Sequence, residues 1–403
     1  MILLERELSS LAKIGDGAHA SLKRINKGIP YLTAKNISKS GIDYKNINYI
    51  SEETYNKYFK DTSNALTQPK KDDILYSIIG SIGAVYVVRD EQIGISSSVA
   101  ILRADKSKIL PEYLAYYMNG PVFDTNIQAV RGGVAQGFMS LAKLGSIIIK
   151  YPKDITYQKK IVDILSTYDN LIGNNQKQIK LLEEAAQRLY KEWFIDLRFP
   201  EHENVEIVDG IPLGWHEDTI DTKVKLLNGF AFKSKNLEET GLFKLVTIKN
   251  VQDGYFEGKN VKYLSKIPDK MPRHCHLNEG DLLLSLTGNV GRVCMVEGNN
   301  FLLNQRVAKI SSDTPAYTYC LFRSNDLFVK INNISNGAAQ QNVSTIRIGQ
   351  IKHWFPNDKL IMDFERLVSP ILKKVVLMKK NIILLEEARD RLLPKLMSGE
   401  IEV

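Results

Sequence analysis

The chain has 403 residues, of which 44% are hydrophobic and 25% are charged, so it can form two or three globular domains with full-sized cores. Its 54 basic and 46 acidic residues give a net charge of +8, a balance that favours a polyanionic partner. The three cysteines form no CxxC pair, no signal-peptide pattern is present, and no apolar run reaches the roughly 18 residues of a membrane span. We therefore expect a cytoplasmic protein with neither a disulfide framework nor a thiol zinc site.

Residues 1–150 alternate short apolar runs with clusters of Gly, Asn, Asp and Ser, a pattern that predicts strands separated by turns. We predict strands at residues 74–79, 84–88 and 147–149, and a helix near residues 111–118. We interpret residues 1–150 as one α+β module with a loop-rich surface.

Residues 151–200 contain a helical segment whose apolar positions alternate in steps of four and three, the spacing of a coiled-coil seam. Adding 203 to each seam position gives a second seam of equal length within residues 357–403. Each helix would be only half-buried alone, so we expect the two to form an antiparallel coiled coil rather than to pack each on its own module. The seams comprise Ile161, Leu165, Tyr168, Ile172, Asn175, Ile179, Leu182, Ala186, Leu189 and Trp193, and Phe364, Val368, Ile371, Val375, Met378, Ile382, Leu385, Arg389, Leu392 and Leu396.

Residues 201–356 begin with a polar segment rich in Pro and Gly, interpreted as a linker, and continue as a second copy of the first module. Asp73 in DDILYSIIGSIG matches Asp281 in GDLLLSLTGNVG, and Gln136 in GGVAQGFMS matches Gln340 in NGAAQQNVS. The phrase LLEEA occurs once in each helix, at residues 181–185 and 384–388. The spacing between matched landmarks changes by a few residues, as expected for loops of variable length. Two similar surfaces joined by helices suggest a two-part target.

Motifs of catalysis are missing from the sequence. No GxxxxGK[ST] phosphate loop, Asn-Pro-Pro-aromatic tetrapeptide or GxSxG elbow occurs. The glycines at residues 80–83 and 288–291 lie between strand-like runs and are predicted to be hairpin turns, not nucleotide cradles. His274-Cys275-His276 is the one metal-like cluster, and without a second ligand pair we interpret it as structural.

These phrases resemble a known family. The segment LLNGFAFKSKNLEETGLFKLVTIKNVQDGYF, from Leu226 to Phe256, is similar to the start of a target recognition domain in type I restriction–modification specificity subunits. GDLLLSLTGNVG, NGAAQQNVSTIRIGQI, the IPLGW entry to the second domain and SGEI near the C-terminus resemble later motifs of that family. The first module departs from this pattern, because it has GDGAHAS where the second has GFAFKS.

The resemblance implies an α+β chain with two tandem α/β target recognition domains, separated by two long helices that form an antiparallel coiled coil. It implies no catalysis on this chain. Each domain would read one half of a split double-stranded DNA sequence, while the helices fix the gap and carry two adenine-N6 methyltransferase subunits. Partner subunits, including a restriction translocase, would bind S-adenosylmethionine, ATP and Mg²⁺. This chain itself would bind no cofactor, no metal and no membrane.

Reading bases requires Arg or Lys for guanine and Asn or Gln for adenine, whereas phosphate contacts set position. We predict DNA contacts from the loops around the glycine turns, although each such residue could also be an ordinary solvated turn residue. The candidates are Ser77, Ser81, Ser96, Ser97, Arg131, Gln136, Ser140 and Lys143 in the first module, and Ser285, Thr287, Asn289, Arg292, Asn304, Gln305, Arg306, Gln340, Gln341, Asn342 and Arg347 in the second.

Lys35-Asn36 and Lys249-Asn250 recur in both copies, and recurrence favours a fold-holding or phosphate role over base reading. Two alternatives to a type I specificity subunit stay open from sequence. One is a specificity subunit of a fused, type IIB-like restriction system, and the other is a scaffold whose duplicated modules bind proteins.

Overall fold

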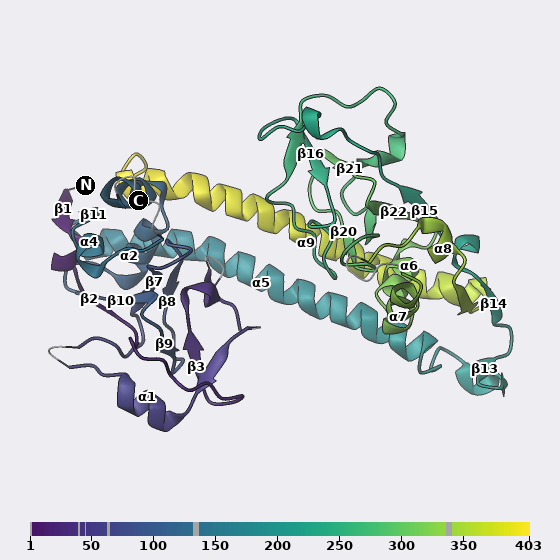
Figure 1. Ribbon diagram of the computed structural model, residues 1–403, viewed down its shortest axis with the longest axis horizontal. Helices are drawn as coiled ribbons and strands as arrows, with labels where there is room; N and C mark the ends of the chain where they lie inside the picture. The colour runs from purple at the N-terminus through teal and green to yellow at the C-terminus, as the bar shows by residue number, and fades with distance from the viewer. Residues whose placement is uncertain (1, 39–40, 45, 63–64, 132–136, 336–340) are drawn as a thin grey trace. The chain divides into compact units, whose positions relative to one another are not determined.

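The computed structural model describes residues 2–38, 41–44, 46–62, 65–131, 137–335 and 341–403 (Figure 1). The chain divides into two compact units, Met1–Asn170 with Leu385–Val403, and Leu171–Leu384. Each unit contains one α+β module and a part of both long helices, α5 (Ile155–Phe194) and α9 (Asp358–Ser398). No helix within the described ranges is both long and apolar enough to cross a membrane.

The first module is built on a four-stranded antiparallel sheet in the order β2-β10-β7-β8, with a three-stranded sheet, β6-β3-β9, and two strand pairs, β1-β11 and β4-β5. Its strands are β1 (Leu3–Glu7), β2 (Ala12–Asp16), β3 (Ile29–Leu32), β4 (Ile37–Ser38), β5 (Gly41–Ile42), β6 (Asn48–Ile50), β7 (Ile74–Ser77), β8 (Val85–Val87), β9 (Gly94–Ile95), β10 (Val99–Ala104) and β11 (Ile148–Pro152). Its short helices are α1 (Glu52–Tyr58), α2 (Pro111–Met118), α3 (Pro121–Arg131) and α4 (Leu141–Gly145).

The second module repeats this topology with the sheets β15-β22-β19-β20 and β17-β16-β21-β18 and the pair β14-β23. Its strands are β14 (His216–Thr219), β15 (Lys225–Asn228), β16 (Phe243–Val246), β17 (Lys262–Leu264), β18 (His276–Leu277), β19 (Leu282–Ser285), β20 (Val293–Met295), β21 (Phe301–Leu303), β22 (Val307–Ser311) and β23 (Lys352–Phe355). Its short helices are α6 (Pro315–Phe322), α7 (Asn325–Asn333) and α8 (Thr345–Gly349). The predicted linker holds a small hairpin of its own, β12 (Ile207–Val208) and β13 (Ile211–Pro212).

The two glycine turns are hairpins, as predicted. Strand β7 pairs antiparallel with β8, and β19 pairs antiparallel with β20, each pair enclosing one turn. The first and last glycines of both turns have positive φ, for example +73° at Gly288 and +84° at Gly291. An L side chain rarely adopts this conformation, so glycine is required for the tight turn.

The recurring Lys-Asn pairs hold the fold through their asparagines. The side-chain Oδ1 of Asn36 accepts from the backbone N–H and hydroxyl of Thr33, both at 2.9 Å, and that of Asn250 accepts from the same groups of Thr247 at 2.7 and 2.9 Å. Both asparagines are buried. Each therefore satisfies polar groups of a tight turn that would otherwise be left unpaired.

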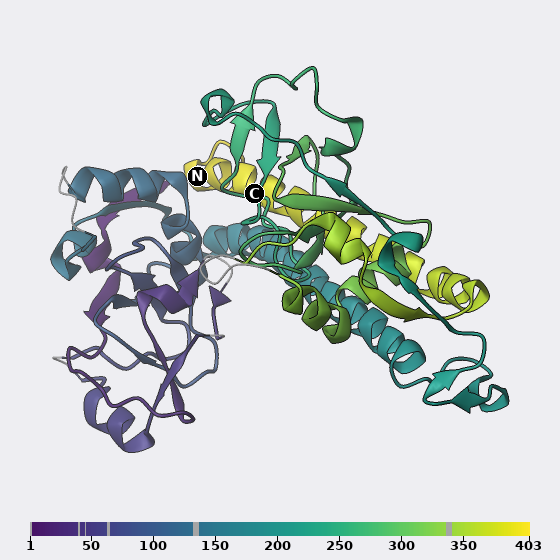
Figure 2. The same ribbon diagram turned by 45° about the vertical axis from the view of Figure 1, so that its right-hand side comes forward.

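The two long helices pack together, as the seams predict, and they run antiparallel. In the first unit, Ile161 and Leu165 of α5 share a core with Leu393 and Leu396 near the end of α9. In the second unit, residues from the C-terminal half of α5 share a core with residues from the start of α9, among them Trp193 with Phe364 (Figure 1 and Figure 2). All twenty seam positions are buried or half-buried.

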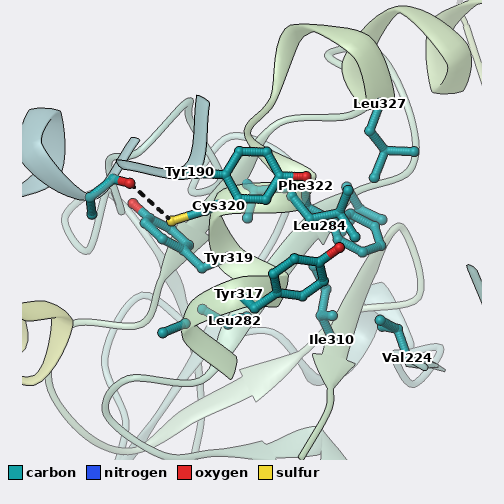
Figure 3. Close-up of a cluster of buried hydrophobic side chains, with 14 of the residues drawn as sticks. Tyr190, Val224, Leu282, Leu284, Ile310, Tyr317, Tyr319, Cys320, Phe322 and Leu327 are labelled. Atoms are coloured by element: carbon teal, nitrogen blue, oxygen red, sulfur yellow. Dashed lines mark hydrogen bonds between the residues drawn. The ribbon is translucent and has the colours of Figure 1, made fainter. Parts of the chain in front are cut away.

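Aromatic side chains fill the joint between α5, α9 and the second module. Phe194 lies 5.1 Å from the rings of both Tyr317 and Phe364, measured between centroids. Figure 3 shows Tyr190 and Tyr317 beside Leu284 and Ile310 of the sheet, with the thiol of Cys320 directed at a backbone oxygen of α5. Helix α6 thus lies between the sheet and the long helices and attaches the module to them.

A buried ion cluster lies at the same joint. The ammonium of Lys379 on α9 is 3.3 Å from a carboxylate oxygen of Glu183 on α5 and 3.1 Å from one of Glu297, which follows β20. It also donates to the carbonyl of Gly254 at 3.3 Å. One lysine therefore connects both long helices to two loops of the second module.

Candidate nucleic-acid interface

An open pocket of about 440 Å³ lies on the second module where three loops meet. It is bordered by the end of β15, the glycine turn after β19, the turn between β21 and β22, and the start of α8. Most of its lining is polar, which suits a surface that exchanges water for hydrogen bonds to a ligand. The lining residues are Asn228, Leu286, Thr287, Gln305, Arg306, Asn342, Val343, Ser344, Thr345 and Ile346.

Backbone hydrogen bonds hold these loops in place. The N–H of Gln305 donates to the carbonyl of Phe230 at 3.1 Å, and that of Val343 donates to Leu286 at 3.0 Å. Gly229 allows the first of these contacts, because a Cβ at this position would lie 2.1 Å from the carbonyl oxygen of Asn304. The side chains at this edge therefore stand on a fixed backbone.

The first module has the same backbone arrangement. Its turn between β9 and β10 is held by Ser97, whose N–H donates to the carbonyl of Ala18 at 3.2 Å, and Met139 donates to Ile78 at 2.8 Å. Gly17 occupies the place of Gly229, since a Cβ there would lie 2.1 Å from the carbonyl oxygen of Ile95. We call these two equivalent surfaces the loop edges of the first and second modules.

Four of the predicted DNA-contact residues in the second module meet at the pocket, namely Thr287, Gln305, Arg306 and Asn342. Around them, Asn289, Gln341 and Arg347 are exposed and Asn304 is half-buried. Among the residues that the structure describes, no carboxylate is within ion-pairing distance of Arg306 or Arg347. Gln340 lies outside the described residues.

Three predicted residues of the second module are engaged inside the protein. Thr287 is buried, and its hydroxyl donates to the side-chain oxygen of Asn342 at 2.8 Å. Ser285 is fully buried, and its hydroxyl donates to the carbonyl of Thr287 at 3.4 Å. Arg292 is half-buried and donates to the side-chain oxygen of Gln252. These contacts fit a role in supporting the turn.

In the first module, Ser81 and Lys143 are exposed at the loop edge. Ser140 caps α4, because its hydroxyl accepts from the N–H of Lys143 at 3.3 Å. Ser77 is fully buried, donates to the carbonyl of Ser81 at 2.6 Å and accepts from Ala84 at 2.8 Å, so it closes the glycine turn.

The remaining predictions in the first module concern four residues. Ser96 and Ser97 are half-buried in the turn after β9. Arg131 ends α3, with only its backbone described, and Gln136 lies outside the described residues.

Sequence reasoning missed several residues of these edges. Asn228 and Ser344 line the pocket, and Ile346 is 71% exposed beside Arg347. Ile79 and Phe138 are exposed at the corresponding edge of the first module. The repeat carries the signal that could have found the last two, because they align with Thr287 and Asn342.

Several buried groups away from the loop edges have strongly shifted pKa values. Burial raises the pKa of the Cys294 and Cys320 thiols, which keeps them protonated and unreactive. Burial also lowers the pKa of His353 to about 4. His274, from the cluster interpreted as structural, donates to the carbonyl of Asn228 at 2.8 Å, and Cys275 beside it is buried. The chemistry that the loop edges offer is hydrogen bonding and charge, which is the chemistry of binding.

Comparison with known proteins gives one consistent result. A family model described as the type I restriction modification DNA specificity domain matches residues 5–184. The chain is similar to the type I restriction enzyme MjaIX specificity subunit of Methanocaldococcus jannaschii, at 26% identity over 312 residues that cover 74% of this chain and 71% of the relative. It is also similar to the HindI specificity subunit of Haemophilus influenzae, at 22% identity, with 82% of this chain and 87% of the relative covered.

The fold agrees with these relatives. The crystal structure of the type I restriction–modification S subunit from M. genitalium matches with a TM-score of 0.59 and 17% identity, covering 98% of this chain and 96% of that one. Together, these findings confirm the resemblance seen in the sequence. The chain belongs to the family of type I restriction–modification specificity subunits, the non-catalytic components that recognise DNA in those systems.

Proposed function

We propose that this specificity subunit reads a split double-stranded DNA sequence, with one module on each half and the paired long helices setting the gap. The observation that carries the proposal is the duplicated loop edge. Both copies keep the same backbone hydrogen bonds but present different exposed side chains. A constant frame with variable side chains is what two readers of different sequences require.

The residues that would touch bases in the second half-site are the exposed polar ones at the pocket. Arg306 and Arg347 suit guanine, and Gln305, Gln341 and Asn342 suit adenine. Asn289 and the half-buried Asn304 complete this edge, and Gln340 stays a candidate. Thr287 is buried and would act by holding the side chain of Asn342. In the first module we keep Ser81, Ser140, Lys143, Arg131 and Gln136, whereas the buried Ser77 and Ser285 support the turns and would contact no base.

The helices have a suitable scale for a spacer. From Ile161 to Trp193 the seam is roughly 50 Å long at about 1.5 Å per residue, and half-sites one DNA turn apart are about 34–36 Å between centres. Inserting four residues after Gln176 and after Ile383 should lengthen the pair by about 6 Å, a stutter that a coiled coil absorbs by local unwinding. Both positions lie between the cross-helix ion pairs Asp169–Arg389 and Glu183–Lys379, which the insertion leaves intact.

The preferred gap should then grow by one or two base pairs, at about 3.4 Å each. The half-site sequences should not change, because the loop edges are untouched. An unchanged gap, or new half-site sequences, would mean that the helices do not set the spacing.

Two methyltransferase subunits would dock on the helices. The repeated phrase LLEEA supports this, because its first leucine is exposed in both copies, at Leu181 on α5 and Leu384 on α9. Two copies of one phrase, each with an exposed leucine, suit two copies of one partner. The partners would supply S-adenosylmethionine, and a restriction subunit would supply ATP and Mg²⁺ chemistry.

The test is purification with the co-encoded adenine methyltransferase, followed by single-molecule mapping of N6-methyladenine. We expect methylation at one split sequence, and none from the specificity subunit with S-adenosylmethionine alone. Arg347→Ala should alter the sequence recognised in one half of the target, and Lys143→Ala should alter the other half. Replacing the exposed Lys373 on α9 with alanine should alter neither half. If Arg347→Ala and Lys143→Ala changed the same half, or both halves equally, one module would not read one half-site.

A further inference from the structure

The two loop edges differ most at one pair of equivalent positions. In the second module, Thr287 and Asn342 form an isolated antiparallel bridge, and the hydroxyl of Thr287 donates to the side-chain oxygen of Asn342 at 2.8 Å. In the first module, the corresponding bridge joins Ile79 and Phe138. Flanking hydrogen bonds confirm the equivalence, because Gly80 donates to Gly137 at 2.7 Å where Gly288 donates to Gln341 at 2.9 Å. A hydrogen-bonded polar pair in one module is an apolar pair in the other.

The apolar pair is exposed. Ile79 is 37% and Phe138 is 55% accessible to solvent. Single exposed apolar residues are common on protein surfaces and need no explanation by themselves. These two are different because they are adjacent and occupy the place at which the other module presents hydrogen-bonding groups. Their position calls for an apolar ligand group at the same point of the interface.

The neighbouring positions of the first loop edge offer little hydrogen bonding in place of the missing pair. Where the second module has Gln305 and Arg306, the first has Ser97 and Ser98. The hydroxyl of Ser98 lies 2.6 Å from that of Ser96 and accepts from the N–H of Ala34 at 3.0 Å, so these hydroxyls bond within the module. Among the described residues of this edge, Lys143 is the long cationic side chain. The two edges thus favour different features of a base pair.

In the major groove, the apolar feature of a base edge is the C5-methyl group of thymine, and phenylalanine is among the side chains that contact it. We propose that Ile79 and Phe138 recognise thymine methyl groups in the half-site of the first module, whereas the second module reads its half-site through hydrogen bonds. This inference rests on the proposed function, because it requires that each module read one half of a split sequence.

The experiment uses the complex of the full chain with its methyltransferase. After the split sequence is mapped, each thymine is replaced singly by deoxyuridine, which removes only the methyl group, and the dissociation constant is measured. At one or more thymines of the first half-site we expect binding about fourfold weaker per contacted methyl group. Phe138→Ala or Ile79→Ala should abolish that loss, because the contact is then already missing.

Asn342→Ala is the matched control at the equivalent position of the second module. It should leave the deoxyuridine effect in the first half-site unchanged. Both Phe138 and Asn342 are exposed, so neither change should unfold the chain, and retained recognition of the other half-site verifies this. The pair of variants separates a local contact from a general weakening of binding.

Three results would overturn the inference and leave the proposed function standing. The first is a first half-site that contains no thymine. The second is an unchanged dissociation constant when deoxyuridine replaces the thymines of that half-site. The third is an equal loss of binding in the wild type, Ile79→Ala and Phe138→Ala. Weaker assembly of Phe138→Ala with the methyltransferase, at unchanged deoxyuridine sensitivity, would instead mark Phe138 as a protein contact. Failure to find any split sequence would overturn the proposed function itself, and the inference with it.

Discussion

Removing the buried charge of Lys379 should destabilise the second unit more than any surface change on the same helix. In Lys379→Met the side chain keeps its approximate length but loses its ammonium. Glu297 would then lose its counterion, and Glu183 would keep only Arg323, 3.8 Å away, with the two glutamate side chains only 16% and 17% exposed. Breaking a buried ion pair in this way costs about 3–5 kcal/mol, a large share of the roughly 5–15 kcal/mol that stabilises a typical domain.

The pKa values at this cluster give the expected pH dependence. Burial would lower the pKa of Lys379, but the two carboxylates together hold it above its ordinary value. Burial raises the pKa of Glu297, and Lys379 partly opposes that rise. Without the ammonium, the Glu297 pKa should rise further, so that the folded state binds a proton more tightly than the unfolded state. The destabilisation of Lys379→Met should therefore shrink as the pH falls from about 7 to 5.

The measurement must resolve the two units, because a chain with more than one unit need not unfold in a single transition. Hydrogen exchange of the helical amides in residues 171–194 and 358–384 reports opening of the second unit directly. Lys380→Met is the matched control. Lys380 is the next residue, half-exposed, and its ion pair with Glu279 at 3.5 Å should contribute no more than about 1 kcal/mol.

A neutral variant tests the cause. Lys379→Met combined with Glu183→Gln and Glu297→Gln removes all three charges and should recover much of the lost stability. If Lys379→Met were no more destabilising than Lys380→Met, the cluster would not be a stabilising contact. If the triple variant were no more stable than Lys379→Met, lost packing rather than unpaired charge would explain the effect.

Three further predictions concern the frame of the modules. Asn250→Ala or Asn36→Ala should lower the free energy of unfolding, measured with denaturant, by about 1–3 kcal/mol, because polar groups of the turn lose their hydrogen-bond partner. Lys249→Ala should change it by no more than about 0.5 kcal/mol. The buried His353, whose pKa is about 4, stabilises the fold as a neutral ring. This contribution to stability is complete above the unfolded-state pKa of about 6.5 and is lost as the pH falls towards 4. The free energy of unfolding of His353→Gln should therefore fall by up to about 3 kcal/mol less than that of the wild type over this pH range. An equal fall in both proteins would contradict this. Gly229→Ala should weaken recognition of the second half-site only, because the new Cβ would collide with a backbone oxygen of the facing turn, and methylation mapping with intact first-half recognition checks it.

Much of the fold could be predicted because its signals are local or repeated. The four-three spacing predicts both long helices, and glycines between apolar runs predict hairpins that need positive φ. The repeat predicts two modules of one topology. Asp209-Gly210 is a further local signal, a hairpin dipeptide inside the segment interpreted as a linker, and both residues have positive φ at the turn of β12 and β13.

The candidate site was harder to predict, because residue type does not tell which way a side chain faces. Ser77 and Ser81 are four positions apart and chemically alike, yet Ser77 is buried in the turn and Ser81 is exposed. The Lys379 cluster joins residues that are nearly 200 positions apart in sequence. Such contacts follow from the packing of α5 against α9, and no spacing rule along the chain reveals them.

The two modules have similar sheets, but they are attached to the long helices by different side chains. Tyr116 on α2 donates to Asp169 on α5, which also accepts from Arg389 on α9 at 2.6 Å. The matching position on α6 is Cys320, whose thiol lies 3.9 Å from a carbonyl of α5. The second joint places its charges elsewhere, in the cluster of Lys379, Glu183 and Glu297. Exchanging one module without its helix residues would therefore leave a charge unpaired at a partly buried site. The exposed residues of the loop edges carry no such constraint. Recognition can therefore be altered at the loop edges at little cost in stability, whereas exchanging whole modules would also require exchanging their joints.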